Sequence, residues 1–167
     1  MAPALEQHRL LAETRQTVSR YGAAPFMTWL DDKGKEERTL SFDELWERSR
    51  RLARKMRDDW GVETGDRVLL CYLPGLAFVE AFWSCLRLRC VAVPTYPPDP
   101  SKLQIGLKKL DLVKKSCGAS LCLTEKALDS MRKALSLTHR WPAGLVWKAT
   151  DRDLKVNKGD NDAPIDD

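Results

Sequence analysis

The sequence predicts an α/β fold: a layered, mostly parallel sheet with flanking helices and a β-hairpin near the N-terminus. Short apolar runs rich in β-branched residues alternate with helical patterns of ten or more residues, and this alternation is typical of parallel strands joined by right-handed crossovers. The turn sequence DDKG at 31–34 separates two extended segments at 25–30 and 36–40, which indicates the hairpin.

One helix is marked by a capping box. Ser41, followed three residues later by Glu44, predicts a helix that runs to about Asp59, ahead of Gly61. Asp43 and Glu44 are adjacent on this helix and do not face each other, so their expected role is capping and interaction with the helix dipole. The inner face is expected to carry Leu45, Leu52 and Met56.

The segment from Gly75 to Pro100, GLAFVEAFWSCLRLRCVAVPTYPPDP, carries the clearest pattern. Its first half predicts a mostly buried helix, because apolar residues recur at steps of three and four residues. These apolar positions are Leu76, Val79, Phe82, Trp83 and Leu86. The strand that follows at 91–93 is expected to be covered on both sides. The prolines from Pro94 onward are expected to take the chain out of the sheet, with Ser101 capping the next helix.

The remaining elements follow from the same reasoning. They are a strand at 67–72, a helix at about 101–116, a strand at 120–124, a helix at about 125–137 and a strand near 145–148. The predicted organisation is an N-terminal segment at 1–20, one α/β region at 21–150 and an acidic, flexible tail at 151–167.

The segment ending in Tyr96-Pro97-Pro98 resembles the early core motif of the adenylate-forming ligases, and this ending is most similar to the fatty-acyl-AMP ligase branch. Supporting stretches in the family's order are LSFDELWERSRRLARKM at 40–56, GVETGDRVLLCYLPG at 61–75 and LVWKATD at 145–151. The resemblance covers roughly residues 20 to 151. It implies that the chain forms part of the large N-terminal domain of such an enzyme.

The resemblance also implies a reaction. Members of the family use ATP and magnesium to convert a carboxylic acid, here a fatty acid, to an acyl-adenylate with release of pyrophosphate. The acyl group then passes to a thiol on an acyl carrier protein or on CoA. The expected partners are therefore the remainder of the ligase domain, a fatty acid and one of these thiol acceptors.

One departure from the family lies between the predicted helix and strand. The family usually has a small residue there, often Gly, whereas this chain has Leu88-Arg89-Cys90. Gly is favoured at a helix C-terminus because the left-handed conformation costs other residues about 1 kcal/mol. Arg89 can offset part of this cost by placing positive charge near the negative end of the helix. The departure is either a tolerated surface change or a sign of relaxed constraint in a non-catalytic copy.

The sequence has no phosphate-binding loop. The GVETG stretch at 61–65 precedes a strand instead of opening a helix after one, so it is neither a dinucleotide fingerprint nor a Walker loop. We therefore assign no catalytic, cofactor-binding or metal-binding residue, and we expect the chain by itself to be inactive and to bind no ATP. Two alternatives stay open: a non-catalytic interaction module derived from this fold, and a ligase for an aromatic or amino acid.

Composition limits the other possibilities. The 167 residues are 43% hydrophobic and 31% charged, which is typical of a globular protein. A formal net charge of +4 is too small to indicate nucleic-acid binding. The sequence has neither an apolar run long enough to cross a membrane nor a recognisable targeting signal, so the expected location is the cytoplasm.

Other chemistry-bearing residues have plain structural interpretations. The cysteines are expected to be free thiols, with Cys71, Cys85 and Cys122 in buried positions, and a zinc site is not expected. Neither His8 nor His139 has a patterned nucleophile beside it. Core or core-edge positions are expected for Trp29, Trp46, Trp83 and Trp147.

A basic set lies along the helix that starts at Ser41. It comprises Arg48, Arg50, Arg51, Arg54, Lys55 and Arg57. Two interpretations are open: a solvated face balanced by nearby carboxylates, or a surface that steers an acidic partner such as a carrier protein.

Overall fold

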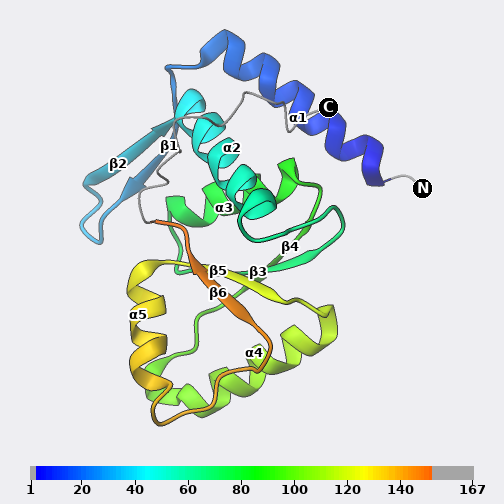
Figure 1. Cartoon of the computed structure of the whole chain (residues 1–167). Coiled ribbons are helices and arrows are strands. Elements are labelled where there is room, and N and C mark those ends of the chain that lie inside the picture. Colours follow the sequence, from blue (N-terminus) through cyan, green and yellow to red (C-terminus); the bar gives the residue numbers. More distant parts are fainter. Residues whose placement is uncertain (1–2, 152–167) are drawn as a thin grey trace.

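A four-stranded parallel sheet forms the centre of the molecule, with helices on both of its faces and a two-stranded hairpin to one side (Figure 1). A computed structural model describes residues 3–151. The elements in chain order are α1 (Pro3–Tyr21), β1 (Pro25–Leu30), β2 (Glu36–Ser41), α2 (Phe42–Asp58), β3 (Arg67–Cys71), α3 (Leu76–Arg87), β4 (Val91–Thr95), the 3-10 turn η1 (Pro100–Lys102), α4 (Leu103–Cys117), β5 (Leu121–Thr124), α5 (Lys126–Leu135) and β6 (Val146–Ala149).

The predicted α/β class is confirmed. The sheet has the order β4-β3-β5-β6, and all neighbouring strands are parallel. The hairpin of β1 and β2 is confirmed too, and Asp31 stabilises its turn by accepting hydrogen bonds from the backbone N–H groups of Lys33 and Lys35. The capping box is present as predicted, because Ser41 and Glu44 each accept the backbone N–H of the other.

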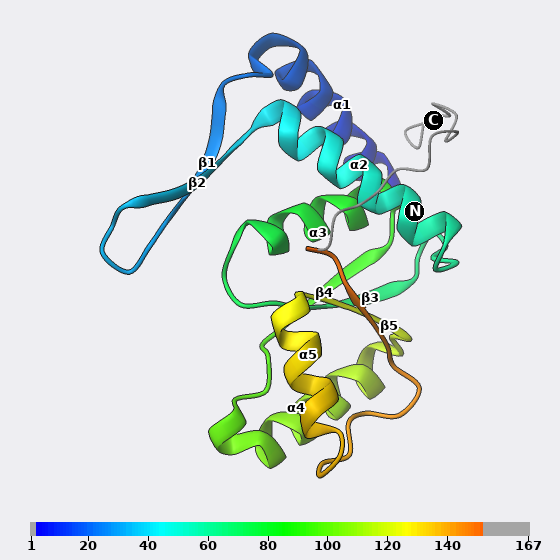
Figure 2. The ribbon, with the colours of Figure 1, turned by 60° about the vertical axis from the view of Figure 1, so that its left-hand side comes forward.

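Successive side chains of each strand point to opposite faces of the sheet, so the core is divided into two layers. On one face of the sheet, Val68 and Leu70 pack with Leu52 and Met56 of α2 and with Cys85 of α3. The opposite face carries Leu69, Cys71 and Cys122, which pack against Leu110 of α4. The helices α2 and α3 therefore cover one face, and α4 and α5 cover the other (Figures 1 and 2).

The helix α3 is mostly buried as predicted, with Ala81 and Cys85 fully buried, but its fully buried face extends to polar residues that were not predicted there. Of the five apolar positions, Leu76 alone is fully buried, and the others are half-buried. The fully buried side of the helix includes Glu80, Ser84 and Arg87. The reason is that α3 packs on both the sheet and α2, so small residues contact the sheet while polar ones meet polar groups of α2.

A polar seam joins α2 and α3. Glu80, 5% exposed, accepts a hydrogen bond from Arg48 Nε at 2.7 Å. Arg87, 2% exposed, donates to Ser49 Oγ at 3.0 Å and to the Trp46 carbonyl at 3.2 Å. Its guanidinium also lies 3.7 Å from the centre of the Trp46 ring. Buried charges are tolerated when they are paired and hydrogen-bonded in this way.

Much of the basic set is balanced within the chain. Four members form ion pairs, namely Arg48 with Glu80, Arg50 with Glu47, Lys55 with Asp59 and Arg57 with Asp58. These pairs favour the solvated-face interpretation, and attraction of an acidic partner stays a prediction.

The strand β4 differs from its prediction. It lies at an edge of the sheet, where Val91 is 49% exposed. Ala92 and Val93 pack on the two opposite core layers, so the predicted cover on both faces is only partial. Pro94 lies inside the strand, opposite Leu70, and the chain leaves the sheet only after Thr95. An edge strand accepts proline because one row of its backbone N–H groups has no partner strand.

Three local predictions also need correction. Asp99, not Ser101, caps the turn before α4, because the Asp99 carboxylate accepts the Ser101 backbone N–H at 2.8 Å. Trp29 lies on the hairpin and is 38% exposed, outside the core. The N-terminal segment, for which no element was predicted, contains α1. The predicted acidic tail lies outside the described residues except for Asp151.

Arg89 adopts the left-handed conformation that the sequence suggested, with φ of +55°. The Cys90 N–H donates to the Cys85 carbonyl at 3.1 Å, and the Arg89 N–H donates to the Leu86 carbonyl at 3.1 Å. This is the usual C-terminal motif in which Gly is preferred at the left-handed position. The helix end is therefore regular, and arginine occupies the strained position.

Candidate functional site

The carboxyl ends of the parallel strands form the best candidate site. The chain leaves β3 through α3 on one face and reaches β5 through α4 on the other. In open α/β sheets, ligands bind outside the strand ends where such connections diverge. The polar residues at or just beyond these ends are Tyr72, Thr124, Glu125, Thr150 and Asp151.

Hydrogen bonds fix three of these residues in place. The Tyr72 and Thr150 hydroxyl oxygens lie 2.8 Å apart, and Thr124 Oγ1 donates to the Cys71 carbonyl at 2.8 Å. All three side chains are buried, with exposed fractions of 5% or less. Burial raises the pKa of Tyr72 well above its ordinary value, so the phenol stays protonated at neutral pH. These hydrogen bonds form a buried polar network at the strand ends.

Glu125 and Asp151 add negative charge beside this strand-end network. The Asp151 carboxylate accepts the Lys126 backbone N–H at 2.7 Å and so caps the start of α5. Partial burial, together with the nearby Asp151 charge, raises the pKa of Glu125. The described residues contain no group of three or more histidine, cysteine or acidic side chains that could hold a metal ion.

An apolar pocket opens next to the network, at the ends of β3 and β4. Its volume is about 340 Å³, and it is lined by Leu70, Tyr72, Leu73, Pro74, Phe78, Pro94, Thr95 and Tyr96. Two aromatic side chains shape one wall, because the rings of Tyr72 and Phe78 meet edge to face at 6.3 Å. Tyr96, the first residue of the Tyr-Pro-Pro ending, is 74% exposed and lies at the pocket. A pocket of this size and polarity suits an aliphatic or aromatic group.

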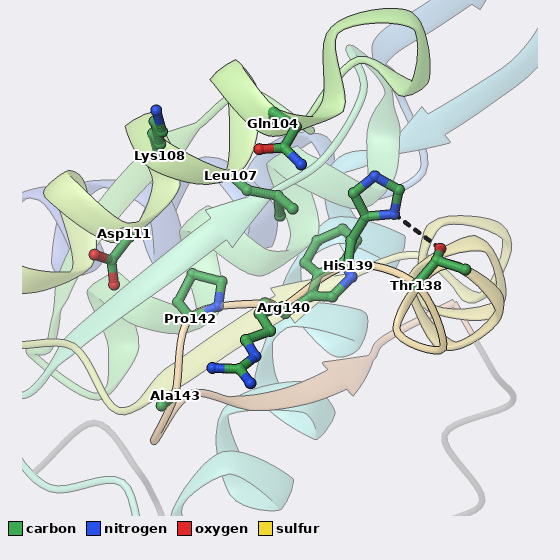
Figure 3. Close-up of a pocket in the computed structure, with 10 residues that line it drawn as sticks. Gln104, Leu107, Lys108, Asp111, Thr138, His139, Arg140, Pro142 and Ala143 are labelled. Carbon is green, nitrogen blue, oxygen red and sulfur yellow. Dashed lines mark hydrogen bonds between the residues drawn. The ribbon is translucent and has the colours of Figure 1, made fainter.

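A second cleft lies between α4 and the loop that leads to β6 (Figure 3). It contains His139, whose Nδ1 lies 2.9 Å from Thr138 Oγ1. The Thr138 hydroxyl is exposed and also donates to the Leu135 carbonyl at 3.3 Å, and the side chain of His8 lies outside the described residues. Cys71, Cys85 and Cys122 are buried as predicted, and burial raises the pKa of the Cys122 thiol, which disfavours the reactive thiolate.

The sequence interpretation assigned no site residue and so did not find the strand-end cluster. The signal was available, since Tyr72, Thr124 and Thr150 are polar residues at the ends of predicted strands. Their convergence depends on the strand order, because Tyr72 and Thr150 are 78 positions apart in the chain.

We expect the Asp151→Asn substitution to lower the pKa of Glu125 towards its ordinary value. Asparagine keeps an oxygen that can cap α5 but removes the charge that opposes ionisation of Glu125. Because a raised carboxyl pKa makes the folded state bind more protons, stability contributed by protonated Glu125 is lost as the pH rises through this pKa. The Asp151→Asn and Glu125→Gln variants should each reduce this loss.

NMR titration of the Glu125 side-chain carboxyl and urea unfolding between pH 4 and 8 measure these effects. The Asp111→Asn variant, changed in a carboxylate on α4 that pairs with Lys115, serves as the control. An unchanged Glu125 pKa in Asp151→Asn would show that the two carboxylates do not interact.

Comparisons with known proteins assign the family. An open α/β sheet with a ligand pocket at its strand ends defines a broad class of binding and catalytic proteins. Residues 14–164 match the model of the AMP-binding enzyme family, and the chain belongs to that family. The predicted resemblance to adenylate-forming ligases is thereby confirmed.

Several relatives are similar to the chain. It is 36% identical over 124 residues to the medium-chain-fatty-acid–[acyl-carrier-protein] ligase JamA of Moorena producens, covering 74% of this chain and 21% of JamA. It is 31% identical over 148 residues to the mouse Disco-interacting protein 2 homolog B, covering 83% of this chain and 9% of that protein. The chain therefore spans about a fifth or less of the length of these relatives.

Solved structures give the same assignment. The fatty acyl-adenylate ligase of L. pneumophila, solved with acyl adenylate and pyrophosphate, is similar with a TM-score of 0.69 and 27% identity, over 83% of this chain and 22% of that one. The adenylation domain of a keto acid-selecting NRPS module shares the fold with a TM-score of 0.69 at 23% identity, over 87% and 27% of the two chains.

Proposed function

We propose that the chain provides the N-terminal scaffold and one apolar wall of the acid-binding pocket in a ligase that activates a fatty acid. The ligase would use ATP to form an acyl-adenylate and then pass the acyl group to a thiol of an acyl carrier protein or CoA. The observation that carries the proposal is the apolar pocket at the ends of β3 and β4. Similarity to the medium-chain-fatty-acid ligase JamA and to the L. pneumophila fatty acyl-adenylate ligase supports the choice of a fatty acid.

The pocket suits an acyl chain better than it suits the ionised head of the acid. Its lining residues carry no charged side chain, and Tyr72, Thr95 and Tyr96 contribute its side-chain hydroxyl groups. Burial of each methylene in such a pocket is worth about 0.8 kcal/mol. The acyl tail would therefore lie along Leu70, Phe78 and Pro94. Its carboxyl group would lie beyond the pocket.

The described residues do not fit the triphosphate of ATP. The N-terminus of α5 lies at the strand-end network, but Asp151 already accepts its Lys126 N–H and adds negative charge. Glu125 lies beside Asp151 and would also repel an anion. We therefore place the groups that hold ATP and magnesium outside the described residues.

A graft tests the proposal. Residues 22–151 would replace the matching segment of the JamA ligase, and pyrophosphate release would be measured with ATP and octanoate. We expect the grafted ligase to be active and the isolated 167-residue chain to be inactive. In the graft, Thr95→Trp fills the pocket and should lower kcat/KM for octanoate by about tenfold or more. Val91→Trp, on the exposed end of the same strand, should change it less than twofold.

Thermal melts of both graft variants distinguish a filled pocket from a misfolded domain. Equal losses for Thr95→Trp and Val91→Trp would remove the pocket from the proposal. Octanoate-dependent pyrophosphate release by the isolated chain would contradict the placement of the ATP site outside it.

The interaction-module alternative is supported by a different observation. Several relatives, including the mouse protein, are named as Disco-interacting proteins. An inactive graft that folds with a normal melt, although wild-type JamA is active in the same assay, would favour this alternative. Activity of the graft with an aromatic acid but not with octanoate would favour the aromatic-acid ligase.

A further inference from the structure

The cleft between α4 and the loop before β6 is separate from the strand-end pocket. Its volume is about 480 Å³, within the range of small-molecule sites. One wall comes from α4 and the other from the loop, as Figure 3 shows. The lining residues are Gln104, Leu107, Lys108, Asp111, Thr138, His139, Arg140, Trp141, Pro142 and Ala143, and none of them lines the strand-end pocket.

The base of the cleft is apolar and held in place by the core. Leu107 is 8% exposed. Trp141 packs edge to face against Trp147 of β6, with ring centres 5.5 Å apart, and both rings join the core layer under α4 and α5. Pro142 adds a rigid apolar surface next to Trp141. An apolar ligand body would therefore meet a surface that is already formed.

The charge around the cleft is positive. Lys108 stands on the helix wall and Arg140 on the loop wall (Figure 3), and neither forms an ion pair with any residue that the structure describes. Lys114 adds a third positive charge near the cleft. Its Nζ lies close to Gly144, the residue that follows Ala143 of the lining. The acidic member of the lining, Asp111, is neutralised by Lys115 at 2.6 Å.

We propose that this cleft binds a small organic anion: a carboxylate or phosphate group on an apolar or aromatic body. The anionic group would lie between Lys108 and Arg140, whose long side chains can turn towards it, with the Gln104 amide as a further donor. The body would lie against Leu107, Trp141 and Pro142. None of its lining residues lines the strand-end pocket, so the cleft is an accessory site and not part of that pocket.

Three probes separate the parts of this proposal. Octanoate carries a carboxylate on an aliphatic body, phenyl phosphate carries a phosphate on an aromatic body, and inorganic phosphate has no body. Binding to the 167-residue chain would be followed by NMR through the indole N–H of Trp141, which has no hydrogen-bond partner among the described residues. We expect at least one organic probe to bind about tenfold more tightly than inorganic phosphate.

The variant Lys108→Gln/Arg140→Gln should weaken binding of that probe by about tenfold or more, because charge-assisted hydrogen bonds are lost. Lys109→Gln is the matched control, since Lys109 is an exposed neighbour on α4 that does not line the cleft. The organic probe that binds more tightly identifies the combination of anionic group and body that the cleft prefers. Equal binding of inorganic phosphate, absence of binding by both organic probes, or equal losses in the two variants would overturn the proposal.

These outcomes are independent of the proposed ligase function. The binding assay needs neither ATP nor catalysis, and the graft assay reads the strand-end pocket. As a further check, Thr95→Trp should leave binding at the cleft unchanged, because Thr95 belongs to the other pocket.

Discussion

Replacing Arg87 by alanine is expected to lower the free energy of unfolding by about 3 kcal/mol. The change removes hydrogen bonds to Ser49 and to the Trp46 carbonyl, and it removes the contact of the guanidinium with the Trp46 ring. It also leaves a cavity between α2 and α3, because Arg87 is among the largest fully buried side chains. Urea unfolding followed by circular dichroism measures the loss.

Two variants serve as controls for Arg87. Arg87→Lys keeps the charge but loses the planar fork, so it should recover only part of the stability. Arg57→Ala removes an arginine on α2 whose side chain is 42% exposed and pairs with Asp58, and it should change stability by less than about 1 kcal/mol. Similar effects of Arg87→Ala and Arg57→Ala would show that the polar seam contributes little.

Replacing Gly106 by alanine is expected to destabilise the protein by about 1 to 2 kcal/mol. Glycine inside a helix normally costs about 1 kcal/mol relative to alanine, so the usual sign of this substitution is stabilising. Here a Cβ atom on Gly106 would lie 2.8 Å from Pro98 Cβ and 2.9 Å from Pro98 Cα. Relief of this contact requires movement of the backbone that links β4 to α4, and this backbone follows Tyr96 at the strand-end pocket.

Ser116→Ala is the matched control for Gly106. Ser116 is exposed in the last turn of α4, so its replacement should be neutral or slightly stabilising through helix propensity alone. Thermal melts of both variants decide the sign. A higher Tm for Gly106→Ala than for the wild type would mean that α4 does not pack as closely on Pro98 as the structure shows.

The elements themselves were largely predictable because their signals are local. The capping box at Ser41, the turn at 31–34 and the alternation of strand and helix patterns each depend on neighbours within a few positions. Those signals predicted the parallel α/β class and placed most boundaries of the helices and strands to within about two residues. The segment ending in Tyr96-Pro97-Pro98 also carried the resemblance to the family to which the chain belongs.

Two of the failed predictions have a cause in a partner distant in the chain. Glu80 and Arg87 were not expected in the core, because helical periodicity counts polar residues as surface and cannot show that α2 offers them hydrogen-bond partners. Pro94 was expected to end the strand, because its sequence does not show that β4 lies at the edge of the sheet.

The candidate site also combines features that the sequence determines with features that only the tertiary structure decides. The sequence alone determined the α/β class, the family and the apolar strands that end in polar residues. Only the tertiary structure decided that β5 inserts beside β3, with β4 on the other side of β3, and this order brings Tyr72 to Thr150 and opens the pocket next to them. The physical reason is that patterning specifies which side chains are buried, whereas long-range packing of strands and helices selects the groups that meet them.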